Sequence, residues 1–252
     1  MEHITLGGLR FQRVEAQSLY LGTNKGGWIY TSQRPRHEVR LPVFYIMKEP
    51  INAADFDSML NEEVNEQNDE FQVTADALKS IMKAGQSLID SGIEGLDEHQ
   101  RWEVRCPSEA EWRCAESNIG LGLDKKQVEV LADAVNSNYR GAMMDGRPRR
   151  FEGIGPMAFH RAAIETHPSK EGITALSSVP LDRPIKGVKA RLVITPVREG
   201  EPQRVPESAD MIANIRTEVV CIFVLGVIPS FVIPILRGMS DYAVSGWANL
   251  LF

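Results

Sequence analysis

The residue types that most often perform chemistry are few in this chain, and their spacing argues against a reactive centre. The three cysteines, Cys106, Cys114 and Cys221, show no metal-ligand spacing, and a soft metal such as Cu(I) requires neighbouring thiolates. His160 and His167 would lie about two turns apart on a helix, which makes a chelate unfavourable. We therefore expect no metal and no bound cofactor.

Glu109 and Glu111 are the nearest approach to a pair of catalytic carboxylates. They lie in the stretch Ser108-Glu-Ala-Glu-Trp112, in which a serine is followed three residues later by a glutamate. This capping-box pattern predicts that Glu111 reaches back to the backbone amide of Ser108. We therefore assign both carboxylates to the start of a helix, on different faces, rather than to general acid or base chemistry.

The composition is that of a folded globular chain and excludes one class of partner. The chain has 252 residues, 43% of them hydrophobic and 25% charged, with a formal net charge of -6. Non-specific nucleic-acid binding needs a basic face, so we expect no nucleic-acid partner. The odd cysteine count without a framework indicates a reducing compartment or inert thiols, and residues 1–10 lack the layout of a signal peptide.

One segment is unlike the rest. From Val219 to Leu236 the chain has no charged residue, and Glu218 and Arg237 flank it. Eighteen helical residues would span about 27 Å, close to the ~30 Å hydrocarbon core of a bilayer. We predict a single transmembrane helix at 216–237, preceded by a soluble domain at 1–198 and by a linker with the helix start at 199–215. A buried core helix or strand is the alternative.

Two features predict that the span packs against other protein. Pro229 and Pro234 each remove a backbone donor, so neighbours must satisfy the freed carbonyls or the helix must distort. Gly226 and Ser230 are four residues apart and form a small-xxx-small face. We expect a lipid bilayer and an integral membrane protein complex as partners.

The tail at 238–252 is too short to cross the bilayer again. It carries Tyr242 and Trp247, ring types that favour the headgroup level, and it ends in Phe252. We predict an interfacial segment that follows Arg237 and lies along the membrane or in a groove of a neighbouring subunit. A frayed end is the alternative.

The charge bias across the span sets the expected orientation. Arg198, Arg204 and Arg216 precede the apolar run, whereas Arg237 alone follows it closely. Because Lys and Arg are enriched in cytoplasmic loops, the soluble domain is expected to lie in the cytoplasm.

Periodicity predicts a mixture of short strands and helices. Residues 9–22 indicate two strands, and residues 38–46 indicate one strand that Pro42 confines to an edge or a bulge. Helices are expected at 53–62, from Thr74 to about 89, and from Ser108 onward. Residues 117–171 have little periodicity, and residues 188–197 predict a late strand.

Three segments, in this order and spacing, resemble the formylglycine-generating-enzyme (sulfatase-modifying factor) family. Residues 11–22 are similar to its opening strand pair. Residues 35–46 fit its Pro-x-His-x-Val-x-Leu-x-x-Phe-x-Ile signature, and residues 104–112 are similar to its Arg-Leu-Pro-Thr-Glu-Ala-Glu-Trp segment. The matching residues are Pro35, His37, Val39, Leu41, Phe44, Arg105, Pro107, Glu109, Glu111 and Trp112.

The resemblance implies an α+β, C-type-lectin-like domain: a small antiparallel sheet, two to three helices and long loops. It also implies that the matching residues are scaffold, with His37 bonded to the backbone and Trp112 as a core anchor. The family's catalytic cysteine pair and its Gly-Gly-Ser-Trp segment have no counterpart between 117 and 198. The chain therefore resembles a degenerate, catalytically empty member.

We expect a membrane-anchored, non-catalytic interaction or structural subunit of a larger membrane complex. One alternative is a metal-dependent oxidase or hydroxylase with a rearranged site, which metal in the purified protein would reveal. Another is a lectin-like ligand-binding module, which a loop-built ligand site would reveal.

Overall fold

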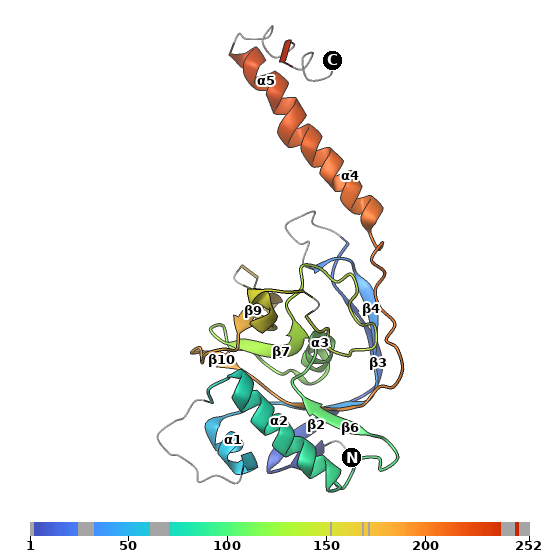
Figure 1. Cartoon of the computed structure of the whole chain (residues 1–252), viewed down its shortest axis with the longest axis vertical. Coiled ribbons are helices and arrows are strands. Elements are labelled where there is room, and N and C mark those ends of the chain that lie inside the picture. Colours follow the sequence, from blue (N-terminus) through green and yellow to red (C-terminus); the bar gives the residue numbers. More distant parts are fainter. Residues whose placement is uncertain are drawn as a thin grey trace.

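The computed structural model describes residues 3–24, 33–60, 71–151, 153–167, 169–170, 172–237 and 245–246. It has a body of short helices and curled, mostly antiparallel sheets, from which one long C-terminal helix projects (Figure 1). Residues 61–70 lie outside the described residues, and so do Tyr242, Trp247 and Phe252 of the tail.

The largest sheet has five antiparallel strands in the order β1-β2-β5-β11-β6. Its strands are β1 (His3–Leu6), β2 (Leu9–Val14), β5 (Phe44–Met47), β6 (Trp102–Arg105) and β11 (Val193–Pro196). Strands β5 and β11 are buried along their whole length, as expected for central strands covered on both faces. Strand β1 was not predicted from the sequence.

Two smaller sheets complete the body. One has the order β10-β7-β8-β9, with β7 (Val128–Ala134), β8 (His160–Thr166), β9 (Thr174–Pro180) and the short β10 (Val188–Lys189), which runs parallel to β7. The other pairs β3 (Gln17–Leu21) with β4 (His37–Leu41).

The structure corrects three expectations about strands. The strand expected at 38–46 is two strands in different sheets, because Pro42 cannot donate to a ladder and the chain turns there. The strand expected at 188–197 is likewise split into β10 and β11. Residues 117–171 contain β7 and β8. Their pairing shifts register between Val130 and Ala134, and this irregularity interrupts the alternation of apolar and polar residues by which a strand is recognised.

The helices follow their local sequence signals. Helix α1 is Ala53–Leu60, and α2 (Ala75–Asp90) begins at the predicted cap, where the Thr74 side chain accepts a hydrogen bond from the amide of Ala77. Helix α3 is Glu109–Ile119 and ends at Gly120, whose φ of 62° is the left-handed conformation that glycine tolerates best. The two predicted N-caps, Thr74 for α2 and Ser108 for α3, are confirmed.

The core has two parts. One lies where α1 and α2 cover the five-stranded sheet, and it includes Phe11 and Ile81. The other surrounds α3 and contains Trp112, Phe44 and Val39, all fully buried. The expected role of Trp112 as a core anchor is confirmed.

A buried ion pair links the sheets. Arg191, which follows β10, bonds through two nitrogens to the carboxylate of Glu129 on β7, and both side chains are fully buried. The guanidinium also donates to the carbonyls of Met47, at 3.2 Å, and Lys48, at 2.6 Å, at the end of β5. Because these partners satisfy the buried charge, the pair fixes the four-stranded sheet against the five-stranded one.

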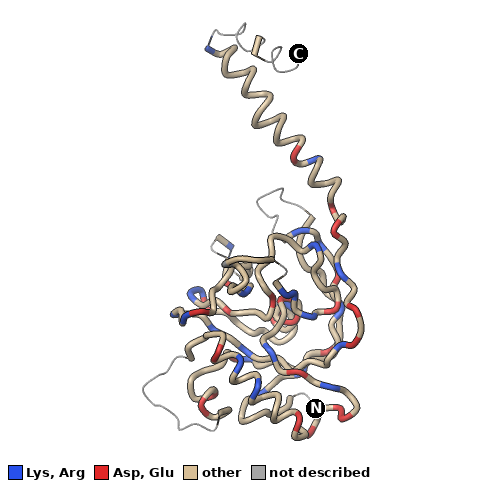
Figure 2. The backbone as a smooth tube through the Cα atoms, viewed as in Figure 1, with Lys and Arg blue, Asp and Glu red and all other residues tan. Residues whose placement is uncertain are grey.

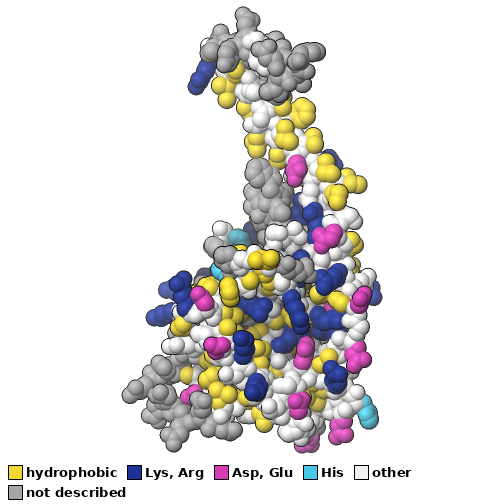
Figure 3. All heavy atoms as spheres, in the orientation of Figure 1, with side chains coloured by type: hydrophobic (Ala, Val, Ile, Leu, Met, Phe, Trp, Pro, Cys, Tyr) yellow, Lys and Arg dark blue, Asp and Glu magenta, His cyan; other side chains and the backbone are white. Residues whose placement is uncertain are grey.

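The C-terminal helix is continuous from Met211 to Leu236 and is long and apolar enough to cross a membrane, with a mean hydropathy of 2.8 and none of its most apolar window buried. It consists of α4 (Met211–Cys221), a π-helical turn η3 (Ile222–Val227) and α5 (Ile228–Leu236). Figures 2 and 3 show a rod with hydrophobic side chains and with charges confined to its two ends.

The π-helical turn is the distortion that the prolines predicted. Pro229 has no amide hydrogen for the carbonyl four residues earlier, and its ring would press against that carbonyl. The amide of Ile228 bonds instead to the carbonyl of Phe223, five residues back. Pi-turns of this kind absorb such mismatches within helices.

The segment predicted as a linker at 199–215 contacts the body before it becomes helical. Val205 is buried, and its backbone bonds to Gly141 and Ala142. Asp210 then forms ion pairs with Arg34, at 3.1 Å, and Arg140, at 3.0 Å. We call Asp210, Arg34 and Arg140 together the Asp210 clamp.

Candidate functional site

The start of α3 is the polar centre of the domain. The Ser108 hydroxyl accepts a hydrogen bond from the amide of Glu111 at 3.3 Å, and the Glu111 carboxylate accepts one from the amide of Ser108 at 2.9 Å. The expected capping box is therefore present. It brings Glu111 back under the helix, into the core.

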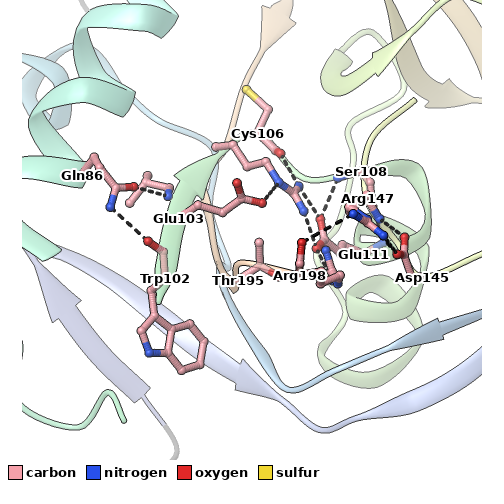
Figure 4. Close-up of polar contacts among 12 residues, drawn as sticks. Gln86, Trp102, Glu103, Cys106, Ser108, Glu111, Asp145, Arg147, Thr195 and Arg198 are labelled. Atoms are coloured by element: carbon pink, nitrogen blue, oxygen red, sulfur yellow. Dashed lines mark hydrogen bonds and ion pairs between the residues drawn. The ribbon is translucent and has the colours of Figure 1, made fainter. Parts of the chain in front are cut away.

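Glu111 is the hub of a buried charge network (Figure 4). The guanidinium of Arg105, on β6, donates to its two oxygens at 2.7 and 2.8 Å, and Arg198 reaches it at 3.4 Å from the segment after β11. Arg105 also donates to Glu103 at 2.9 Å, and Arg198 donates to the Thr195 hydroxyl at 3.3 Å. The network joins β6 and the start of α3, which are close in sequence, to the segment after β11, in which Arg198 lies 87 positions from Glu111.

The charges of this network keep one another ionised. Burial disfavours ionised Glu111, but the charge and hydrogen bonds of Arg105 outweigh it and hold the pKa of the carboxyl below its ordinary value. Burial likewise opposes the charged form of Arg105, and Glu111 and Glu103 together raise its pKa. A carboxylate held this way is poorly suited to proton transfer, so we assign the network to structure.

A cavity of about 210 Å³ opens on the other side of the α3 start. Its apolar wall includes Leu21, Ala110 and Leu176, and its polar wall includes His37, Glu109, Asp133 and Tyr139. Arg147 and Arg149 also line it, and Arg147 is paired with Asp145 at 2.7 Å. The walls come from β3, β4, α3, β7, β8, β9 and the 135–149 segment.

Tyr139 and Glu109 form the polar floor of this cavity. The single O–H of Tyr139 is shared between the two Glu109 oxygens, each 2.8 Å from the hydroxyl oxygen, and Arg113 donates to Glu109 at 2.8 Å. Burial, and then the negative charge of Glu109, raise the pKa of Tyr139 well above its usual value. The phenol therefore stays protonated at neutral pH.

Asp133 supports the same floor from β7. Its oxygens accept hydrogen bonds from the amides of Glu109, at 2.8 Å, and Arg149, at 2.7 Å. Burial nevertheless raises the pKa of this carboxyl to about 6, because desolvation of the charge exceeds the effect of the two bonds. Asp133 thus titrates close to physiological pH.

His37 projects into the cavity as a neutral ring. Its Nδ1 lies 3.0 Å from the carbonyl of Pro35, which confirms the expected backbone partner. Because a carbonyl only accepts, Nδ1 carries the proton, and burial lowers the pKa of the ring. Nε2 is then unprotonated and can accept a hydrogen bond. The ring packs edge-on against Tyr139, with centroids 5.0 Å apart.

The two cysteines of the domain are structural. Both are buried, and Cys114 accepts a hydrogen bond from Gln17 at 2.7 Å. Burial raises the pKa of the Cys106 thiol to about 12 and also raises the pKa of Cys114. Protonated thiols are poor nucleophiles and poor metal ligands, and the described residues contain no His/Cys/Asp/Glu cluster that could hold a metal.

The predicted histidine pair is placed differently from the helical spacing we considered. His160 begins strand β8 and His167 follows its end. At about 3.3 Å per residue, seven residues of strand separate them by about 23 Å. A chelate by His160 and His167 is still unfavourable, but the reason is their separation along a strand rather than their spacing on a helix.

The structure brings some of the predicted scaffold residues together. Pro35, His37 and Glu109 lie at or beside the cavity, whereas Arg105 and Glu111 form the buried network beneath it. The others are parts of the scaffold: Val39, Leu41 and Phe44 lie in the core with Trp112, and the carbonyl of Pro107 accepts a hydrogen bond from the amide of Ala132.

Sequence reasoning missed Asp133, Tyr139 and Arg198. Each contributes through contacts with segments at least 24 residues away, such as the bond between the Glu109 amide and Asp133. The only sequence signal was the polar run Asn136-Ser-Asn-Tyr139, which interrupts the apolar strand before it.

The predicted membrane residues lie along the C-terminal helix. Gly226 is in η3, Pro229, Ser230 and Pro234 are in α5, and Arg237 ends it. A Cβ atom added at Gly226 would meet nothing within 4 Å beyond its chain neighbours and the backbone of its own helix, so this face is open in the isolated chain.

Comparison with known proteins indicates a fold and no family. No family model matches the chain, and no curated protein matches it. Among solved structures, PvdO from Pseudomonas aeruginosa is similar over 77% of this chain and 99% of its own, with 14% identity and a TM-score of 0.53. Variable protein 1 of Treponema denticola covers 77% of this chain and 98% of its own, with 13% identity and a TM-score of 0.48. The likeness to PvdO is one of fold.

Proposed function

We propose that this chain is a membrane-anchored, non-catalytic interaction or structural subunit of a larger membrane protein complex. Its domain would be a C-type-lectin-like, formylglycine-generating-enzyme-like scaffold, and residues 216–237 would be its transmembrane helix. The observation that carries the proposal is an apolar helix, unburied over its most apolar stretch, that leaves a folded domain through the Asp210 clamp. Soluble proteins rarely expose an apolar surface of this extent to water, and such a surface marks a membrane or protein contact.

The non-catalytic assignment is supported by the polar groups of the domain. The best-placed carboxylate, Glu111, is committed to Arg105 and Arg198, and the domain's thiols are protonated. Glu109 is already bonded to Arg113 and Tyr139. These groups stabilise the scaffold and leave little free reactivity.

Membrane attachment is tested by fractionation of cells that express the chain. The full chain should remain in the membrane pellet after alkaline carbonate washing. A chain truncated after Thr217 keeps the Asp210 clamp and should become soluble with an unchanged circular dichroism spectrum for the body. If the truncated chain is unfolded, the helix belongs to the core and the proposal fails.

The complex is tested by affinity purification in mild detergent followed by mass spectrometry. Gly226→Leu is a useful variant, because the open space around Gly226 means that a larger side chain perturbs only a partner. We expect it to remain inserted and to lose co-purifying membrane proteins. Val224→Leu, on an exposed position of the same turn, is the matched control.

The proposed orientation places the domain in the cytoplasm, from the Lys/Arg bias around the span. Protease added to sealed, right-side-out cells should leave the domain intact. Digestion of the domain there would reverse the orientation without affecting the anchor.

The cavity supports a second candidate function, a lectin-like ligand-binding module. Its volume of about 210 Å³ suits a small molecule, and the unprotonated Nε2 of His37 is an acceptor that favours a ligand with an N–H or O–H donor. A panel of small amines, amides and polyols can be screened by the ¹⁵N shift of the His37 ring. Ala162→Leu, which adds bulk to the wall, should abolish any shift that reports binding.

A further inference from the structure

The domain exposes apolar side chains at the edge of its four-stranded sheet. Before β8, Ile154 and Phe159 are 104% and 70% exposed. Beyond the other end of β8, Ile173 is 48% exposed, immediately before the edge strand β9. These exposed apolar side chains lie at the two ends of the β8–β9 hairpin, and we call Ile154, Phe159 and Ile173 together the β8–β9 rim.

The Asp210 clamp determines which side of the domain faces the membrane. Asp210 has a φ of 55°, a conformation that aspartate tolerates better than most residues, and its carboxylate binds Arg34 and Arg140 instead of capping α4. The clamp is nearly buried, because the side chains of Asp210 and Arg34 are 9% and 6% exposed. The helix therefore leaves the body in a defined direction.

Figure 1 shows the direction in which the helix leaves the body. The helix starts above β4 and leans toward the side of the body that carries β9, whereas α1 and α2 lie at the end of the body that is far from the helix. Eight residues, 211–218, separate the body from the uncharged stretch, which corresponds to about 12 Å of helix. A bilayer around the apolar stretch would thus lie close to the rim side.

We propose that the β8–β9 rim is a second membrane contact, with Ile154 and Phe159 inserted at the headgroup level of the bilayer that holds the helix. This inference rests on the proposed function, because it requires the helix to span a membrane. Exposed apolar side chains at the interface gain burial without crossing the hydrocarbon core. The domain is then held at two points and cannot swing freely on its helix.

The expected lipid is zwitterionic as readily as anionic. Arg150 and Lys170 are exposed beside the rim, but Glu152 and Glu171 are their near neighbours in sequence. In the sequence each of these cations has a carboxylate within two residues, so apolar insertion rather than attraction to anionic headgroups should dominate the contact.

The test uses the full chain in phosphatidylcholine nanodiscs. Ile154→Cys is labelled with an environment-sensitive fluorophore in a Cys221→Ser background, and doxyl-labelled phosphatidylcholine serves as the quencher. Cys106 and Cys114 are buried with raised pKa values, so they should not react with the label. Glu94→Cys, exposed in the loop after α2, is the matched control.

The label at Ile154 should lose fluorescence when the quenching lipid is included, and the label at Glu94 should not. If neither label is quenched while the chain stays in the nanodisc, the rim is not a membrane contact and the anchor proposal stands. If the chain does not enter nanodiscs, the proposed function fails and this inference fails with it. Phe159→Cys repeats the measurement in case Ile154→Cys disturbs its loop.

Discussion

Removing the charge of Glu111 should strongly destabilise the domain. In Glu111→Gln the shape is kept, but Arg105 loses the partner that accepts its bonds at 2.7 and 2.8 Å, and Arg198 loses a contact at 3.4 Å. The side chain of Glu111 is fully buried, and that of Arg105 is 11% exposed. Arg105 then keeps only the partly exposed Glu103, at 2.9 Å, as an acidic partner, so a largely buried charge is left poorly compensated.

The magnitude follows from this burial. Breaking a buried ion pair by removing one partner costs about 3–5 kcal/mol, out of a total stability of about 5–15 kcal/mol for an ordinary domain. Glu38→Gln is the control, because its pair with Arg40 spans 3.5 Å and Arg40 is 75% exposed. Exposed pairs contribute about 0–1 kcal/mol, so the control should unfold almost as the unmodified chain does.

Urea unfolding of the full chain in a non-ionic detergent, followed by tryptophan fluorescence, measures both variants. The double variant Glu111→Leu with Arg105→Met should be more stable than Glu111→Gln. It removes the Arg105 guanidinium together with the carboxylate, so the buried charge of Arg105 is not left without its main partner. A cost below about 1 kcal/mol for Glu111→Gln, or a double variant as unstable as the sum of its single changes, would refute the reasoning.

The pH dependence of this effect has a definite sign. The pKa of Glu111 is lowered by folding, so its contribution to stability is present above its unfolded pKa and is lost as the pH falls through the folded value. The difference between Glu111→Gln and the unmodified chain should therefore be full at neutral pH and shrink in acid. A difference that grows on acidification would contradict the assignment.

Four further outcomes are expected. Trp112→Ala should cost about 3–5 kcal/mol in the same unfolding assay, and a cost below about 1 kcal/mol would exclude a buried ring. The Asp133 carboxyl should titrate near pH 6 by ¹³C NMR, and because folding raises its pKa, its contribution to stability should be present in acid and be lost as the pH rises through about 6; a midpoint near 4 would contradict this. Cys106→Ser with Cys114→Ser should preserve co-purification with partners, and copper bound to the unmodified chain but absent from this variant would overturn the non-catalytic proposal. Truncation after Gly238 should leave insertion unchanged and weaken co-purification, whereas full retention by the complex would show that the tail does not dock.

The parts of the structure that the sequence predicts are those specified by neighbouring residues. Thr74 caps α2 through an amide three residues away, and Ser108 and Glu111 close their capping box over the same separation. The contact between the His37 ring and the Pro35 carbonyl spans two residues. Such interactions are encoded within one turn of chain, so a single sequence is sufficient to recognise them.

The cavity could not be predicted for the opposite reason. Tyr139 bonds to Glu109 across 30 positions, and Arg198 reaches Glu111 across 87. Nothing local marks Tyr139 or Arg198 as a partner, because each lies in an irregular segment without periodicity. The boundary between β10 and β11 was missed similarly, since Arg191 interrupts the apolar run only to pair with Glu129, 62 positions away.

The buried charge pairs occupy comparable places in the fold. Glu129 binds one sheet to another through Arg191, Glu111 binds α3 to two other segments, and Asp210 binds the body to the helix. Hydrophobic burial is non-directional and would accept many arrangements of the same segments. A buried charge is costly without its partner, so each pair penalises arrangements that separate its two segments. We infer that the direction of the span is set in the same way as the contact between the sheets, by a charge that has only one satisfactory place.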